Sequence, residues 1–520
     1  MRDLLLVLPV VLPLLGGGMI LLMRLRGKRR IGTRTLEWFV GGIVLLNSML
    51  VAALVFGENL GGEQILFSLF SDQTVSFRLD RMGSLFAGLV AFLWPLATLY
   101  SFEYMKQEER KDTFFAWYVM TYGITMGIAL SANLVTLYFF YEMLTLITFP
   151  LVLYPMTREA IRASRMYLYY SIGGAAFAFI GLVFVLMYST AGSTDFVPGG
   201  VLDPVRMTED RNVLLFIYVL AFFGFGVKAA LVPGHAWLPA ATVAPTPVTA
   251  LLHAVAVVKS GAFAILRFTY FSFGTELLRG SWAQWIVMGA ALVTILYGST
   301  MAVREVHWKR RLAYSTISNL SYILFGASMM SPLGLAAALC HLVAHAFMKI
   351  CSFFCAGAVM HQSGKEYIYE LDGLGRRMPV TFGCLTAASL SLMGIPLFAG
   401  FISKWNLCLS AFSWGGESVA GGIPGGFLPF VGAAVILYSA LMTGIYMLTV
   451  LVRAYFPRIS GLTGGMQGVG TADSDEMARI TDPGWRMLVP LLIFVLGILV
   501  IGLHSAPLMD VLNLIGGEAG

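Results

Sequence analysis

Long apolar runs alternate with short polar segments along almost the whole chain. A run of about 20 apolar residues is long enough to cross the ~30 Å hydrocarbon layer of a bilayer as a helix. We count about fourteen such runs, and no polar stretch between them is long enough to fold by itself. The pattern predicts an all-α integral membrane protein with spans near residues 3–24, 36–57, 80–104, 113–130, 132–153, 165–189, 212–231, 246–270, 282–303, 311–330, 333–359, 380–411, 426–455 and 486–508.

The composition agrees with a bilayer as the solvent for most of the chain. Apolar residues make up 58% of the 520 residues and charged residues only 12%, whereas soluble domains carry roughly 25% charged residues. The net charge of +6 lies in short loops between spans. This placement favours a role in membrane orientation, and we expect no nucleic acid among the partners.

Lysine and arginine are concentrated in alternate loops. One set occupies residues 24–34, 106–111, 158–165, 304–311, 365–377 and 453–486, and the other set holds only Arg2, Arg78, Arg81, Arg206, Arg211 and Arg279. By the positive-inside rule the first set faces the cytoplasm. Both termini are then expected on the outer face of a prokaryotic inner membrane, with an even number of spans. The first run lacks a small-residue cleavage site, so we expect a retained span and no signal peptide.

Two of the predicted spans are interrupted next to a lysine. The seventh runs through Gly224 and Gly226 to Lys228 and then meets Pro233, Pro239, Pro245 and Pro247, and the twelfth carries Gly394-Ile395-Pro396 before Lys404. A helix break at membrane depth is tolerated only where the freed backbone groups line a cavity or are buried in protein. We therefore expect both breaks to lie inside the molecule.

The spacing of the two interruptions predicts an internal repeat. Five spans separate them, so spans 4–8 and 9–13 would face opposite ways, as in transporters with inverted repeats. The chain is then a single membrane domain with three N-terminal helices (1–111), a first five-helix repeat (112–270), a second five-helix repeat (271–456), and a cytoplasmic loop with the last helix (457–520).

Eight ionisable residues fall near the middle of predicted spans. A charge at a helix centre costs roughly 2.5–3.5 kcal/mol in a bilayer, so we expect these residues to face the protein interior. Arg267, close to the end of a span, is instead expected to extend its side chain toward the membrane surface. The eight residues, which we call the central row, are Glu142, Lys228, His253, Lys259, His341, His345, Lys349 and Lys404.

The chemistry of the central row suggests proton transfer. Glu142 is its only carboxylate, and Lys228 is the natural opposite charge, although a static ion pair between two helices is an alternative. One carboxylate cannot pair with four lysines, so desolvation must keep some lysines neutral at rest. Such groups can accept and release protons, and repulsion between protonated neighbours would move a proton in steps.

His341, His345 and Lys349 follow one another at intervals of four and so share one helical stripe. The two histidines are interpreted as a proton relay. His253 is interpreted in the same way, as a relay residue beside Lys259. Interhelical hydrogen bonding and a metal or bis-histidine haem site are alternatives for these histidines. The five cysteines form no CxxC pair, so no zinc or iron–sulfur site is expected and we predict no cofactor in this chain.

Several segments match the signature of a known family. The longest is Lys228 to Ala240 followed by Ala244 to Leu252, and further matches are Tyr141-Glu142, Arg311 to Ser318, His341 to Lys349 and Gly400 to Lys404. The sequence closely resembles the proton-conducting antiporter-like membrane subunits of respiratory complex I, Mrp-type cation/proton antiporters and membrane-bound hydrogenases. The resemblance covers nearly the whole chain.

The resemblance implies fourteen helices with two inverted five-helix repeats. It also implies a paired role for Glu142 and Lys228, a bridging role for Lys259 and an exit-side role for Lys404, a position that is lysine in some members and glutamate in others. The chain differs from the largest complex I member because it ends soon after the last span, with no long lateral helix. That difference argues against the distal position in complex I and leaves membership in a hydrogenase or an Mrp complex as the alternative.

The leading hypothesis is a proton-translocating subunit of a multisubunit membrane complex, with sodium/proton exchange left open. Other membrane subunits are the expected partners, and redox chemistry, such as NADH:quinone oxidoreduction or hydrogenase activity, would belong to peripheral subunits. Two alternatives remain. The first is a haem- or quinone-binding redox subunit that uses His341 and His345, and the second is a structural scaffold with inert ion pairs.

Overall fold

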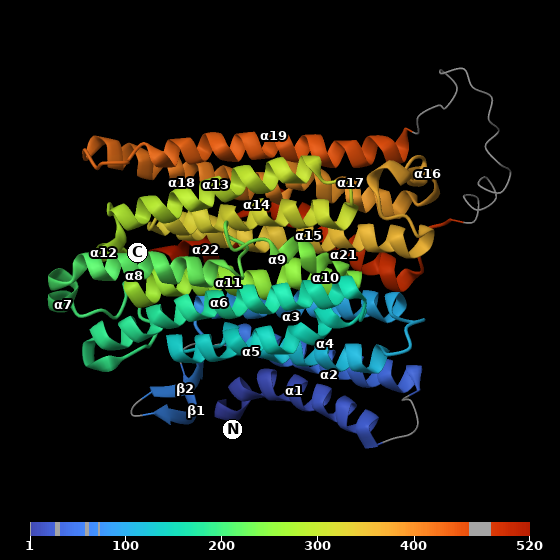
Figure 1. Cartoon of the computed structure of the whole chain (residues 1–520), viewed down its shortest axis with the longest axis horizontal. Coiled ribbons are helices and arrows are strands. Elements are labelled where there is room, and N and C mark those ends of the chain that lie inside the picture. The colour runs from blue at the N-terminus through green and yellow to red at the C-terminus, as the bar shows by residue number, and fades with distance from the viewer. Residues whose placement is uncertain (1, 27–31, 58–61, 71–72, 457–479, 520) are drawn as a thin grey trace.

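The computed structural model describes residues 2–26, 32–57, 62–70, 73–456 and 480–519. Most of the predicted loop at 457–485 therefore lies outside the described residues. The long helices run nearly parallel to one another along the longest axis of the molecule (Figure 1). They are α1 (Arg2–Arg26), α2 (Thr33–Val55), α3 (Arg81–Tyr104), α4 (Lys111–Ala129), α5 (Leu134–Leu153), α6 (Arg158–Tyr188), α8 (Arg211–Gly226), α13 (Trp282–Arg304), α14 (Trp308–Ser328), α15 (Pro332–Ser363), α17 (Pro379–Met393), α18 (Ala399–Ala420), α19 (Leu428–Tyr455) and α21 (Trp485–Leu503).

The helices confirm an integral membrane protein. In the described part of the chain, ten helical segments are long and apolar enough to cross a membrane, and α8 and α17 are shorter apolar helices. These two short helices are the first halves of the interrupted segments. The total of fourteen spans and the inverted repeats remain predictions.

Both interruptions occur where glycine and proline predict them. The chain leaves α8 at Gly226 and turns through residues 227–236 before the short helices α9 (Trp237–Ala240) and η2 (Ala241–Val243). The second interruption separates α17 from α18, and Gly394 adopts a positive φ of 88° there. Because a side chain is rarely accommodated at such a φ, glycine suits this turn.

The predicted eighth span is less regular than the sequence suggests. Residues 246–273 form α10 (Thr246–Ala250), a π-helical turn η3 (Leu251–Val255), α11 (Val257–Arg267) and a second π-helical turn η4 (Phe268–Phe273). π-helical turns often occur at functional sites. The first of them carries His253.

The structure also contains small elements that the hydrophobic pattern did not predict. An antiparallel hairpin joins β1 (Glu63–Phe70) and β2 (Gln73–Arg78), and a last helix, α22 (Ala506–Ala519), packs against α15. The short helices are α7 (Pro204–Glu209), α12 (Thr275–Leu278) and α16 (Leu374–Arg377), with single turns η1 (Thr190–Gly192) and η5 (Ile368–Glu370). The fold is therefore mostly, not wholly, helical.

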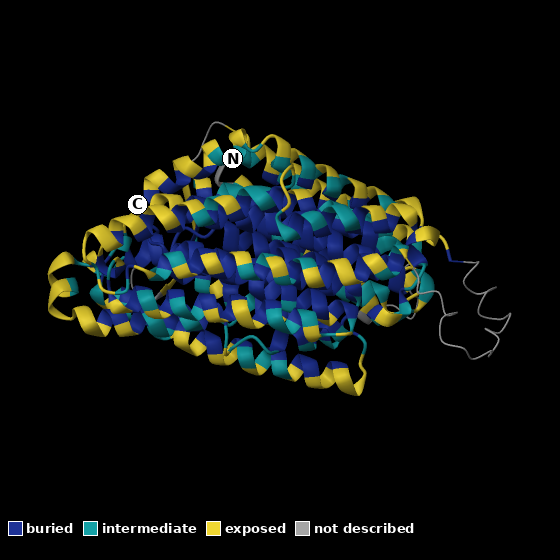
Figure 2. Cartoon of the chain, turned by 90° about the horizontal axis from the view of Figure 1, so that it is seen from above, coloured by how far each residue is buried: buried dark blue, intermediate teal, exposed yellow. Residues whose placement is uncertain are grey.

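The centre of the bundle is formed by α15 and the segment 246–273. The apolar window of each is completely buried inside the chain, and the view from above shows buried positions inside a shell of mixed exposure (Figure 2). Such helices have no lipid-facing side, so polar groups on them must be satisfied by protein or water. Five of the eight central-row residues lie on these two elements.

Arg267 corrects one expectation from the sequence. Its side chain does not extend to the membrane surface but is fully buried, with both terminal nitrogens 2.5 Å from the carboxylate of Asp80. The rings of Phe196, Phe263 and Phe271 each lie about 5 Å from the guanidinium. This ion pair connects the N-terminal helices with the centre of the bundle, which explains how the charge is accommodated.

Basic side chains gather at one end of the helix bundle. The C-terminal ends of α1 and α19 and the N-terminal ends of α4, α6, α14 and α17 meet there, and we call it the basic end. The hairpin, α7 and α12 lie at the opposite end (Figure 1). The helix ends at the basic end carry Arg24, Arg110, Arg162, Arg310, Arg377 and Arg453.

Candidate functional site

Lys228 lies at the first interruption and reaches toward α5. Its Nζ is 3.6 Å from Glu142 Oε1 and donates a hydrogen bond to the backbone oxygen of Tyr141. The same nitrogen lies 3.3 Å from the centre of the Tyr141 ring. The structure thus forms the predicted contact between Glu142 and Lys228 and adds an aromatic face beside it, which also favours a cation.

Glu142 differs from the other central-row residues because it is partly exposed. Its side chain is 29% exposed, whereas that of Lys228 is 1% exposed. It lines a groove of about 450 Å³ whose other walls are mostly aliphatic and aromatic side chains of α5 and α6. Glu142 therefore meets the expectation of facing the protein interior only in part, because its Oε1 atom is buried toward Lys228 while the rest of the side chain lines this groove.

Lys259 occupies the fully buried centre of the bundle, on α11. Its Nζ is 2.8 Å from Nδ1 of His345 on α15. Two residues further on, Gly261 packs against the interruption so closely that a Cβ there would lie 2.6 Å from the backbone nitrogen of Ala229. This close approach positions α11, and Lys259 with it, directly beside the turn that carries Lys228.

His341, one helical turn before His345, leads toward the second interruption. The two imidazole rings are 5.8 Å apart, and Nδ1 of His341 is 3.0 Å from the hydroxyl oxygen of Ser403. The neighbouring Lys404 donates hydrogen bonds to the carbonyl oxygens of Leu392 (2.7 Å) and Met393 (3.1 Å). These carbonyls are free because α17 ends there.

Lys349 continues the stripe on α15 but points to a third helix. Its Nζ donates to the hydroxyl of Ser315 on α14 at 2.5 Å and to the carbonyl of Leu312 at 3.3 Å. The Ser315 hydroxyl is also 2.5 Å from that of Tyr446 on α19. The stripe on α15 is thus a branching point with contacts to α11, α18 and α14, and we call it the α15 hub.

His253 is buried on the π-helical turn, with its ring 4.9 Å from that of Phe353. Neither ring nitrogen has a hydrogen-bond partner among the residues that the structure describes. The predicted proximity to Lys259 is not accompanied by a direct hydrogen bond among the described residues. Buried polar atoms of this kind are usually satisfied by water.

The lysines of the central row differ in whether a carboxylate lies beside them. Among the described residues, Lys228 is the one lysine of the row that lies within 4 Å of a carboxylate. In the described part of the chain, the polar contacts of Lys259, Lys349 and Lys404 are with an imidazole, hydroxyls and carbonyl oxygens, and Lys404 also lies 5.7 Å from the centre of the Tyr322 ring. Three buried lysines without a counter-charge are costly when protonated, so the arrangement favours groups that change their protonation state.

A family model described as NADH:quinone oxidoreductase/Mrp antiporter, TM matches residues 131–421, which is more than half of the chain. The chain belongs to this transmembrane family. A second model, described as NADH-ubiquinone oxidoreductase (complex I), chain 5 N-terminus, matches residues 70–115. The family predicted from the sequence motifs is thereby confirmed.

The relatives of this chain include an antiporter subunit and an oxidoreductase subunit. A probable K(+)/H(+) antiporter protein of Rhizobium meliloti, named as the A/B subunit, is 36% identical over 377 residues, which cover 71% of this chain and 36% of the relative. The N subunit of the NADH-quinone oxidoreductase of Desulforudis audaxviator is 32% identical over 438 residues, which cover 81% of this chain and 80% of the relative. The chain therefore spans about a third of the antiporter relative and most of the oxidoreductase relative.

Two solved structures share the fold of this chain over nearly its whole length. A chain of the Mrp complex from Dietzia sp. DQ12-45-1b has a TM-score of 0.80 at 21% identity, with 100% of this chain and 98% of that chain covered. A chain of the membrane-bound sulfane sulfur reductase, described as an archaeal respiratory membrane complex, has a TM-score of 0.79 at 22% identity. The match covers 99% of this chain and 97% of that chain.

The candidate site also includes residues that the sequence analysis did not identify. Ser403 and Ser315 link the α15 hub to α18 and α14, Tyr446 extends the contact to α19, and the Tyr322 ring lies 5.0 Å from that of His341. The available signal was the unusual density of hydroxyl and amide residues between 315 and 322, in the middle of a predicted span.

Proposed function

We propose that this chain translocates protons through the central row as a membrane subunit of an energy-converting complex, in exchange for a sodium or potassium ion where that complex is an antiporter. The observation that supports the proposal most directly is the α15 hub. Three fully buried groups on one helix contact Lys259 and, through hydroxyls, the neighbourhood of Lys404 and α14. Such a connected set of titratable groups is suited to stepwise proton transfer.

In this mechanism the charge of Lys228 controls the rest of the row. When Glu142 lies close, the protonated form of Lys228 is stabilised, and its positive charge opposes protonation of Lys259. When the Glu142 contact weakens, Lys228 releases its proton and Lys259 can take one up. The proton then passes by way of His345 and His341 to Ser403 and Lys404 at the second interruption.

The proposal includes a topology. We place fourteen spans in the membrane, with spans 4–8 and 9–13 as inverted repeats, the basic end in the cytoplasm and both termini outside. The two interruptions support this arrangement because each brings a row lysine to freed backbone oxygens or turns. They would mark the two half-channels through which protons enter and leave the row.

Partner subunits are part of the proposal. Glu142 is partly exposed in an otherwise apolar groove at membrane depth, and such a carboxylate is expected to be covered by another protein. The relatives are named as subunits, and the similar solved chains belong to complexes. We assign no cofactor to this chain and expect electron transfer, where the complex performs it, in peripheral subunits.

The proposal is tested in everted membrane vesicles that contain the intact complex. Lys228→Met and Glu142→Gln are introduced separately, and proton movement is followed with a pH-sensitive dye after addition of the energy source or of sodium or potassium chloride. We expect at least a tenfold loss of initial rate in each variant, because general acid–base groups typically contribute 10²–10⁴-fold.

Lys106→Met is the matched control, because Lys106 is an exposed lysine at the basic end that pairs with Glu103. It should retain the wild-type rate. Wild-type rates in both Lys228→Met and Glu142→Gln, with normal amounts of assembled complex, would instead favour the structural scaffold.

A further inference from the structure

A polar cavity opens at the basic end, outside the central row. Its volume is about 490 Å³, and it lies between the N-terminal parts of α6 and α14, the short helices α9 and η2, and the segment that follows α15. We call it the basin. Its acidic and basic lining residues are Glu159, Arg162, His307, Lys309, Arg310 and Glu366.

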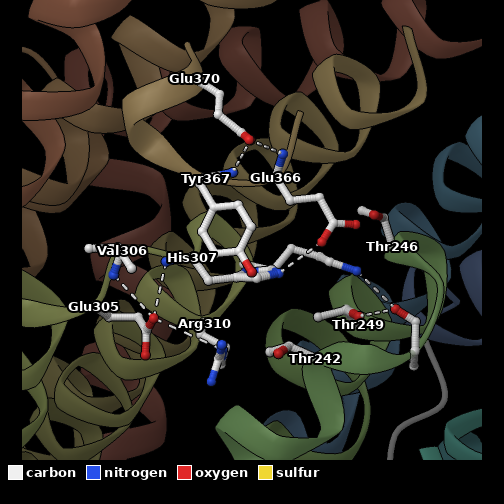
Figure 3. Close-up of polar contacts among 12 residues, drawn as sticks. Thr242, Thr246, Thr249, Glu305, Val306, His307, Arg310, Glu366, Tyr367 and Glu370 are labelled. Carbon is white, nitrogen blue, oxygen red and sulfur yellow. Dashed lines mark hydrogen bonds and ion pairs between the residues drawn. The ribbon is translucent and has the colours of Figure 1, made fainter. Parts of the chain in front are cut away.

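His307 and Glu366 form a pair at the wall of the basin (Figure 3). His307 Nε2 is 3.3 Å from Glu366 Oε2, and the glutamate side chain is 53% exposed whereas the histidine is 12% exposed. Nδ1 of His307 is buried and has no hydrogen-bond partner in the described part of the chain. The carboxylate therefore faces water, and the imidazole links it to the protein interior.

The backbone around the pair holds it in place. Glu305 Oε1 accepts hydrogen bonds from the backbone nitrogens of Val306 (3.1 Å) and His307 (3.0 Å), and Glu370 binds the nitrogens of Glu366 and Tyr367 in the same way (Figure 3). The His307 side chain itself makes no capping bond to α14. It is therefore free to take part in chemistry without loss of the helix start.

Lys309 connects the basin to the interrupted seventh segment. Its side chain is largely buried, and its Nζ donates to the carbonyl oxygen of Ala244 at 3.2 Å. The Thr249 hydroxyl donates to the same oxygen at 3.0 Å. Four residues after Thr249, on the adjoining π-helical turn, lies His253 with its two unpartnered nitrogens.

We propose that the basin is a proton-loading site, in which Glu366 and His307 take protons from water at the basic end. Lys309 in its neutral form accepts the proton and releases it to water inside the turn, which passes it to an unpartnered nitrogen of His253. The Ala244 carbonyl oxygen accepts hydrogen bonds from Lys309 and Thr249 and so fixes the geometry of the turn without carrying the proton. The His307 imidazole accepts a proton at Nε2 and gives one up from Nδ1, so that each transfer leaves a neutral ring, and rotation of the ring restores the starting tautomer. This inference rests on the proposed proton translocation and adds an entrance to it.

The electrostatic surroundings of His307 suit rapid release. Burial lowers the pKa of the imidazole below its ordinary value, Glu366 opposes this shift, and Lys309 and Arg310 reinforce it. A ring with a lowered pKa is mostly neutral near pH 7 and holds a proton only briefly. The other groups facing it are Glu305, Tyr367, and across the basin Glu159 and Arg162.

The experiment measures how the rate of proton movement depends on pH at the basic end. His307→Gln and Glu366→Gln are compared with wild type in everted vesicles containing the intact complex, whose outer medium is titrated between pH 6 and 9. A proton-loading site should limit the rate most strongly at high pH, where the proton concentration in the medium is low. We expect about a tenfold lower rate in His307→Gln at the alkaline end of the range and a much smaller loss at pH 6.

His504→Gln is the matched control, because this exposed histidine follows α21 at the opposite end. It should keep the wild-type pH profile. Unchanged profiles in both His307→Gln and Glu366→Gln would overturn the loading site. Lys228→Met separates this result from failure of the proposed function: if Lys228→Met also retains the wild-type rate, the central row itself is wrong.

An anionic lipid headgroup could also bind the arginines of the basin. Purified complex is therefore reconstituted in vesicles of phosphatidylcholine alone or with one fifth cardiolipin. Equal wild-type rates in both, with the pH effect of His307→Gln retained, support proton loading. A wild-type rate that requires cardiolipin, and loses this requirement in Arg162→Gln while the pH profile of His307→Gln stays normal, would overturn it.

Discussion

At the scale of single residues, three of the four lysines in the central row have no carboxylate partner among the described residues. Lys259 is the clearest example, because it is completely buried and its one hydrogen-bond partner among the described residues is the ring nitrogen of His345. A permanent charge at this position would be strongly disfavoured. The proposed proton transfer gives a reason for a lysine here, because a group that can lose its proton avoids this cost.

Lys259→Met is predicted to separate function from stability. Methionine has a similar length and fills the same space without a charge, so the thermal unfolding midpoint of the complex should be unchanged or slightly raised. Proton movement should fall at least tenfold because the link between Lys228 and the α15 hub is lost. The two readouts are proton flux in vesicles and thermal unfolding of the purified complex. A marked loss of thermal stability together with normal flux would contradict the prediction.

At the scale of helices and strands, the hydrophobic pattern predicted most long helices and both interruptions. The central row could also be predicted, because a charge within an apolar run stands out in the sequence. Its hydroxyl partners could not, since serine and threonine are common in buried helices and usually bond to their own backbone. The partner of Arg267 was missed because Asp80 is 187 residues away in the chain.

The ion pair between Asp80 and Arg267 is predicted to fasten the N-terminal helices to the centre. Asp80→Asn leaves a buried guanidinium without its counter-charge, which typically lowers the free energy of unfolding by roughly 3–5 kcal/mol. Because Asp80 is partly exposed, we expect a loss of about 3 kcal/mol. Thermal unfolding should show a clear fall in stability.

The double variant Asp80→Asn/Arg267→Met provides the test of cause. Removing both charges should restore a substantial part of the stability, because the unpaired buried charge is gone. Equal destabilisation in the single and double variants would mean that packing around the aromatic rings, and not the ion pair, accounts for the loss.

At the scale of the whole molecule, the separation of charge between the two ends predicts the orientation in the membrane. Lys106 is exposed at the basic end, and Glu209 is exposed on α7 at the opposite end. The four most deeply placed native cysteines are buried, and Cys408 is partly buried. Replacing all five by serine gives a background in which one introduced thiol reports one end.

Glu209→Cys should react with a membrane-impermeant maleimide added to intact cells, and Lys106→Cys should react only after the membrane is permeabilised. Both should react equally once the protein is in detergent, which controls for accessibility of the thiol. The reverse pattern in intact cells would place the basic end outside and exchange the entry and exit sides of the proposed pathway.

The burial of α15 limits how this molecule can move. A shift of an α-helix by one residue turns it through 100° and displaces it by 1.5 Å, so such a movement would break the contacts of His341, His345 and Lys349 at the same time. A helix that is enclosed along its apolar length would also have to displace its neighbours from every side. We therefore expect α15 to keep its position during proton transfer. Conformational change would be confined to side-chain rotations and to the two helix interruptions, after α8 and between α17 and α18.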